Sequence, residues 1–126
     1  MNRLFVLNFV KVSQALNGLA KFSLPIKTTL KLRKLIKMTE EEYQAFEDVR
    51  LARLRDLAEK DESGNPVLIG QNYSLSKENE LVLAKEISEY LKQDLSFDKI
   101  DISELEGVSI SMEQINTLSP FLGGMD

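Results

Sequence analysis

Acidic side chains are the residues of this sequence whose types could do chemistry. Glu40, Glu41, Glu42, Glu47 and Asp48 lie in one short stretch, and paired carboxylates can act as general acid and base or bind a hard cation. On a helix, however, they spread around the surface, and such runs are usually solvated. The chain has no His and no Cys, which removes imidazole bases, thiol nucleophiles and the usual zinc ligands. We therefore expect no catalytic residue, no metal site and no cofactor, and we predict that the protein is not an enzyme.

A second acidic segment resembles a calcium-binding loop. Asp61 and Glu62 are followed by Gly64 and Asn65, but the regular ligand spacing and the Glu at position twelve of such loops are missing. The segment is therefore better interpreted as a turn.

Three lysines could form a basic stripe. Lys27, Lys31 and Lys34 are spaced by four and three residues, which places them on one helix face where they could follow a phosphate backbone. Acidic residues 40–42 come soon after, and no aromatic residues are interleaved to stack on bases. A solvated helix face is the favoured interpretation, and nucleic acid is not the expected partner.

The length and charge of the chain limit its class further. With 126 residues, 43% of them hydrophobic and 29% charged, it fits one globular domain, residues 1–126. The net charge of −4 is unevenly distributed: residues 1–37 hold eight bases and no acid, and the remainder holds eight bases and twenty acids. This asymmetry can indicate an arm for an acidic partner, or two halves that attract each other within the fold or across an oligomer. We favour the second explanation.

No segment predicts insertion into a membrane. No apolar run approaches the roughly 20 residues of a spanning helix. The apolar stretch 4–10 is interrupted by Asn8 and followed by Lys11, so it does not fit a signal peptide. A cytoplasmic location is expected.

A long central helix is the main predicted element. After an amphipathic segment over residues 1–23, Pro25 can start a helix, and residues 26–60 contain neither Gly nor Pro. A single helix over 24–60 would be about 50 Å long, more than a globule of this size can cover. A break at Thr39, which forms a capping-box pattern with Glu42, is the alternative. We favour a continuous helix because its apolar stripe runs through Thr39.

That stripe is the candidate partner-binding surface. The predicted contact lies within residues 26–57, and the partner is a second copy, giving a homo-oligomer, or a different protein. The residues assigned to it are Leu32, Ile36, Tyr43, Phe46 and Val49.

The rest of the chain predicts a mainly α fold with a small β element (α+β). Residues 61–75 form a loop with a brief strand at 67–69, and residues 76–94 form a helix that packs on the long helix as an antiparallel hairpin. Residues 95–126 form a strand over 95–102, a turn at Gly107 and a short C-terminal helix that Ser111 and Gln114 open as a capping box. The apolar faces predicted for the second and last helices are Leu83, Ile87, Tyr90 and Leu91, and Met112, Ile115 and Leu118.

Four places in the sequence carry a resemblance to a known group of proteins. They are Leu24-Pro25-Ile26-Lys27 with residues 32–35, Phe46-Glu47 with Arg50, residues 60–65, and the segment 105–111 with Ile115, Leu118 and Phe121. In order and spacing they resemble a family of short tailed-bacteriophage proteins of unassigned function, over residues 24–121. Residues 57–60 depart from the pattern, where similar proteins tend to have Lys-Tyr-Gly. The pattern contains no catalytic residue.

The resemblance implies a phage protein. The overlong amphipathic helix, the split charge and the absence of catalytic residues predict that it works through protein–protein contacts, most simply as a virion structural or assembly component. It would be found in the host cytoplasm during infection, or in the virion. The alternative is a small accessory protein that inhibits a host enzyme or defence system, with acidic residues imitating a polyanion. These are Glu40, Glu41, Glu42, Glu47, Asp48, Asp61 and Glu62. A nucleic-acid-binding protein is the third hypothesis.

Overall fold

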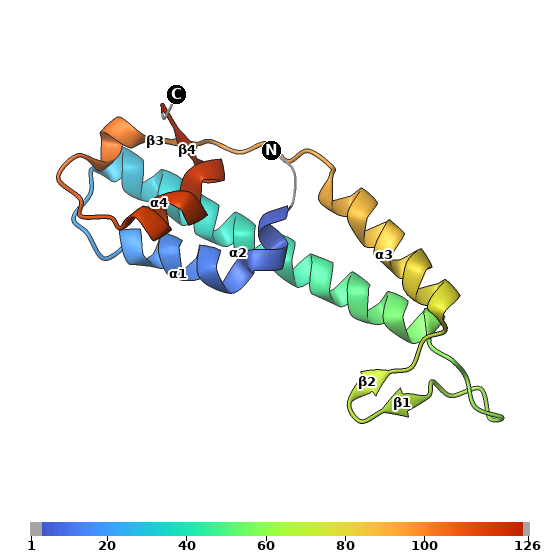
Figure 1. Ribbon diagram of the computed structural model, residues 1–126. Coiled ribbons are helices and arrows are strands. Elements are labelled where there is room, and N and C mark those ends of the chain that lie inside the picture. The colour runs from blue at the N-terminus through green and yellow to red at the C-terminus, as the bar shows by residue number, and fades with distance from the viewer. Residues whose placement is uncertain (1–3, 125–126) are drawn as a thin grey trace.

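One helix of 32 residues, α2 (Ile26–Leu57), runs through the whole molecule in the computed structural model, which describes residues 4–124. Its first half packs against α1 (Phe9–Leu19), which follows a 3-10 turn at Leu4–Asn8. The C-terminal helix α4 (Met112–Leu118) packs on α1 (Figure 1). We call residues 4–41 and 92–124 the body.

The second half of α2 projects from the body, and α3 (Lys77–Leu91) returns beside it (Figure 1). Between them, strands β1 (Leu68–Ile69) and β2 (Asn72–Tyr73) form an antiparallel hairpin at the tip. We call residues 42–91 the arm. The mainly α fold with a small β element, including the long helix and its antiparallel hairpin partner, is as predicted.

The long helix is continuous because nothing in its sequence ends it at Thr39. The Thr39 hydroxyl donates to the carbonyl of Ile36 at 2.9 Å within the same helix, and so makes a helical back-bond rather than an N-cap. The helix ends at Leu57, where Ala58 becomes extended, three residues before the predicted end.

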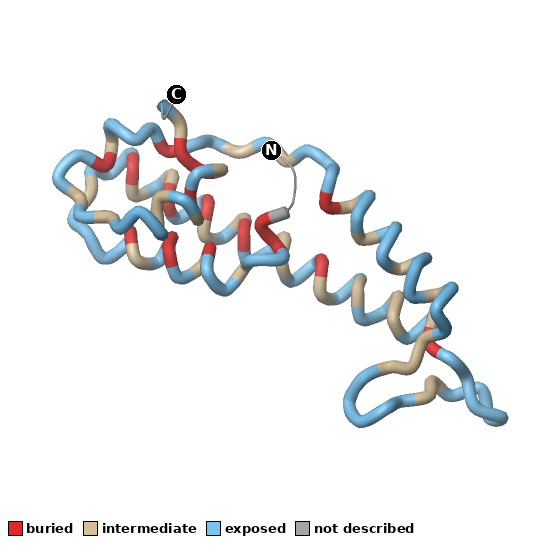
Figure 2. Tube along the Cα trace, in the orientation of Figure 1, coloured by how far each residue is buried: buried red, intermediate tan, exposed pale blue. Residues whose placement is uncertain are grey.

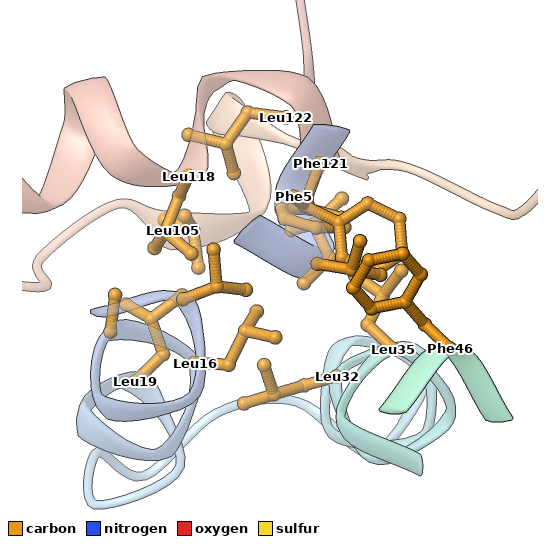
Figure 3. Close-up of a cluster of buried hydrophobic side chains, with 14 of the residues drawn as sticks. Phe5, Leu16, Leu19, Leu32, Leu35, Phe46, Leu105, Leu118, Phe121 and Leu122 are labelled. Atoms are coloured by element: carbon orange, nitrogen blue, oxygen red, sulfur yellow. The ribbon is translucent and has the colours of Figure 1, made fainter. Parts of the chain in front are cut away.

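Apolar side chains from four elements form the core of the body. Leu16 and Leu19 of α1 face Leu32 and Leu35 of α2, and the C-terminal segment closes over them with Leu118 (Figure 3). Phe121 lies in this core with its ring centroid 5.6 Å from that of Phe5 and 5.4 Å from that of Phe97. Figure 2 shows that buried positions are concentrated in the body.

The C-terminal region differs from its prediction in two ways. A strand was expected over 95–102, but only β3 (Ile100–Asp101) is a strand, and it pairs in parallel with β4 (Leu122–Gly123). Asp101 then caps a 3-10 turn, Ile102–Leu105, by accepting from the Ser103 amide at 2.9 Å, which ends the strand. A second 3-10 turn, Ser119–Phe121, leads from α4 into β4.

The predicted capping box of α4 is confirmed, but the prediction that Met112 lies on the buried face of this helix is wrong. The Ser111 hydroxyl accepts a hydrogen bond from the backbone N–H of Gln114, and the side-chain oxygen of Gln114 accepts one from the backbone N–H of Ser111. Leu118 is fully buried, whereas Met112 is 70% exposed. Met112 is the first residue of a seven-residue helix, and it lies beyond the part of α4 that covers the core.

The arm buries few side chains compared with the body. Its buried residues are Phe46, Ala58 and Leu91. The turn predicted at residues 61–65 is confirmed. The Asp61 carboxylate accepts hydrogen bonds from the backbone N–H groups of Ser63 and Asn65, and Gly64 has a positive φ of 83°. Among the described residues, no helix has the length and hydropathy needed to span a bilayer.

Candidate protein-binding site

The structure places most of the predicted contact stripe inside the chain's own fold. Leu32 and Phe46 are buried, Ile36 packs against the core, and Tyr43 stacks on Phe9 with ring centroids 4.1 Å apart. Leu32, Ile36 and Tyr43 are therefore internal packing positions and not contact residues, because other parts of the chain cover their side of α2. Phe46 is buried too, but it also lines the groove described below. Val49, which is 69% exposed, is the remaining residue of the prediction and lies on the surface.

The predicted basic stripe is interrupted at its centre. Lys27 and Lys34 are exposed, but the Nζ of Lys31 lies 2.9 Å from the Glu104 carboxylate. The buried Thr28 hydroxyl donates to the other oxygen of Glu104 at 2.9 Å. Lys31 is thus an internal partner rather than a phosphate ligand, and it joins the basic N-terminal part of the chain to its acidic remainder.

The Glu104 carboxylate makes stability sensitive to acid. Hydrogen bonds from Lys31 and Thr28 hold the pKa of Glu104 below its usual 4.5. A lowered pKa in the folded chain contributes stability above the ordinary value, and this contribution is lost as the pH falls through the lowered one. We expect Glu104→Gln to be less stable than the wild type at about pH 7, with the gap closing towards about pH 3. Thermal unfolding at several pH values measures this, and Glu106→Gln, an exposed neighbour, is the control. An unchanged gap at acid pH would contradict the assignment.

The seven acidic residues of the polyanion hypothesis do not form one surface. Glu42 accepts a hydrogen bond from the Tyr90 hydroxyl at 3.1 Å, Glu47 is paired with Arg50, and Asp61 organises the turn at the tip. The others are exposed: Glu40, Glu41, Asp48 and Glu62. They are distributed from the middle of α2 to the end of the arm, so they do not present a compact block of charge.

A groove lies between α2 and α3 in the arm. Its volume is about 280 Å³, and its walls are mostly apolar. The residues that line it include Phe46, Val49 and Arg53 of α2, and Leu83, Ile87 and Tyr90 of α3. Leu83, Ile87 and Tyr90 were predicted as the buried face of this helix, but they are only half-buried, because the two helices do not close over one another.

Polar and aromatic contacts hold the two walls of the groove together. The rings of Phe46 and Tyr90 stack with centroids 5.5 Å apart at the end near the body. At the far end, the Asn79 side-chain amide donates to the Leu57 carbonyl at 2.9 Å. Between them, the Arg53 guanidinium donates two hydrogen bonds to Glu86, at 2.8 and 3.0 Å. The groove is therefore spanned by contacts at both ends and at one point between.

The charges beside the groove are paired within the chain. Arg53 lowers the pKa of Glu86 by hydrogen bonding, and Arg50 does the same for Glu47. Arg50 and Glu47 form their own two-point contact, with distances of 3.0 and 2.8 Å. A partner on this face would thus meet apolar walls bordered by neutralised ion pairs.

The open side of the groove presents small and apolar residues. Ala45, Val49 and Ala52 are exposed and share one face of α2, given their spacing of four and three. Val82 of α3 is 37% exposed and lies four residues from Glu86, on the same side of its helix. We call the exposed residues Ala45, Val49, Ala52 and Val82, together with the groove that Ala45 and Val49 line, the arm face. The sequence pattern identified Val49 but missed the α3 side, since half-buried residues follow the same spacing as core residues.

The described residues bring together no group of His, Cys, Asp or Glu side chains that could hold a metal ion. No protein-family model, curated protein or solved structure gives a significant match to the chain. The arm face, with its open apolar groove, is the surface that points to a function.

Proposed function

We propose that this protein works by binding another protein through the arm face. The observation that carries the proposal is an apolar groove that stays open along a projecting two-helix arm, with Val49 69% exposed beside it. Apolar surface of this kind gains free energy when a partner removes it from water. Amphipathic helices and apolar side chains are the usual occupants of such grooves.

We place this contact in a virion structural or assembly component of a phage, on the basis of the long α2 helix that projects beyond the body and of the sequence resemblance to short tailed-phage proteins. The packed core of the body and the projecting arm fit a role that depends on contact with another protein. Acidic mimicry of a polyanion has weaker support, because Glu42 and Glu47 are engaged within the arm. Nucleic-acid binding has weaker support too, because Lys31 is paired with Glu104.

Co-purification with paired variants tests the proposal. Val49→Lys places a charge on the arm face, whereas Val10→Lys makes the same change at a 66% exposed valine of α1. We expect proteins that co-purify with the tagged wild-type chain, from bacteria that produce it, to be lost with Val49→Lys and kept with Val10→Lys. Equal retention by both variants would contradict a contact through the arm face. Circular dichroism of both variants checks that the helices are intact.

A further inference from the structure

We infer that the occupant of the arm face is the arm face of a second copy of this chain, in a two-fold symmetric dimer. The inference rests on the proposed function, because it names the partner of the same surface. It is carried by the exposed area of the chain, the shape of the arm face and the pairing of its charges.

The chain exposes more surface than a compact monomer should. Its accessible area is 8541 Å², whereas a compact protein of 14.3 kDa exposes about 6,800 Å². The difference exceeds the roughly 800 Å² that each subunit contributes to a standard interface. In the arm, two helices lie side by side with no third layer against them (Figure 1). A second arm would supply the missing layer and complete a four-helix arrangement.

The arm face contains both a projection and a cavity. In a two-fold symmetric dimer, the same surface of each chain forms the contact, so this surface must be complementary to itself. Every contact between two residues therefore occurs twice, once in each direction. Val49 projects at the border of the groove, and Phe46, Leu83 and Ile87 form the groove walls. In the dimer that we infer, the two α2 helices run antiparallel, and Val49 of each chain enters the groove of the other chain. Ala45 and Ala52, one turn to either side, let the two α2 helices approach closely, since interaxial distance depends on the side chains at the contact.

The charged residues that line the groove, Arg50, Arg53 and Glu86, are paired within the chain, so the groove suits an identical partner better than an oppositely charged one. A surface with net charge repels its own copy, but Arg50 is paired with Glu47 and Arg53 with Glu86. Neither pair leaves an uncompensated charge to be neutralised by an acidic or basic ligand. The second copy would then cover the apolar side chains that lie between these two ion pairs.

Sedimentation velocity across a hundredfold concentration range tests the inference on the purified full chain. We expect the wild type to shift from 14.3 kDa towards twice that mass as concentration rises. Val49→Lys buries an unpaired charge at the centre of the contact, so we expect its dissociation constant to rise about 100-fold. Val10→Lys, the matched exposed valine on α1, should dimerise like the wild type.

Each other outcome overturns the inference and is distinguishable from a failure of the proposed function. A wild type that stays at monomer mass throughout excludes the second copy. If Val49→Lys nevertheless abolishes co-purification of a different protein, the arm face is a binding site for that protein. A dimer that survives in Val49→Lys and dissociates in Val10→Lys would place the self-contact on the body instead.

Discussion

Phe121→Ala is expected to lower the free energy of unfolding by about 3–5 kcal/mol, the cost of removing a large buried aromatic side chain. Phe121 is 1% exposed and contacts the rings of Phe5 and Phe97. Its loss leaves a cavity where the N-terminal turn, the C-terminal segment and α2 meet. Typical domains have only about 5–15 kcal/mol of stability, so the variant should be close to unfolding. Urea denaturation followed by circular dichroism measures the change.

Met112→Ala is the matched control in the same region. Met112 is 70% exposed, and a surface substitution of this kind usually changes stability by less than about 0.5 kcal/mol. Equal destabilisation by the two variants would show that the C-terminal segment does not close the core as described.

Phe46→Ala is expected to lower the free energy of unfolding by about 3 kcal/mol and to loosen α3, because Phe46 lies at the edge of the body core where the arm begins. Phe46 is 8% exposed and stacks on Tyr90, which is the aromatic contact that fixes the end of α3 nearest the body. Without the Phe46–Tyr90 contact, α3 is held to α2 by the Arg53–Glu86 ion pair and by the hydrogen bond from Asn79 to Leu57. Both are exposed or half-exposed, so they contribute little to stability. Amide hydrogen exchange should therefore become faster in α3 than in α1.

Val49→Ala, one turn further along α2, separates packing in the core from packing at the surface. Val49 is 69% exposed, so the free energy of unfolding of the monomer should change by less than about 0.5 kcal/mol. If Phe46→Ala changed exchange in α1 and α3 alike, the arm and body would unfold as one unit, contrary to the description of a loosely packed arm.

Local sequence signals were sufficient for most elements of the fold. The absence of Gly and Pro from 26–57 predicted an uninterrupted α2, the Ser111–Gln114 capping box predicted the start of α4, and Asp61 with Gly64 predicted the turn of the arm. Each of these depends on residues close together in the chain, where propensity and hydrogen-bonding chemistry are readable from the sequence.

Features that depend on distant contacts were not predictable in the same way. The parallel pairing of Ile100 with Leu122 joins two short strands. Ile100 lay within a longer predicted strand, but no strand was predicted at Leu122. Periodicity showed that Leu32, Phe46 and Val49 belong to an apolar stripe, but not which of them the chain itself would cover. Burial changes along α2 because the body covers its first half, and α3 covers the second half only in part.

The candidate site follows from that change in burial. Val49 was identified by its place in the stripe, whereas the groove required the observation that Leu83, Ile87 and Tyr90 face α2 without closing against it. Apolar residues spaced by three and four occur both in a helix that packs in its own core and in a helix whose apolar face binds another protein. The difference between the two is a matter of tertiary packing.

The most direct measurement of whether the arm face is a contact surface is photo-crosslinking in bacteria that produce the protein. A photoreactive phenylalanine analogue replaces Val49 in one variant and Val10, a comparably exposed valine of α1, in the other. A contact through the arm predicts discrete crosslinked products from position 49 and none from position 10, and a product of twice the chain's mass would identify the second copy. No product from position 49, or the same products from both positions, would contradict a binding role for the arm face.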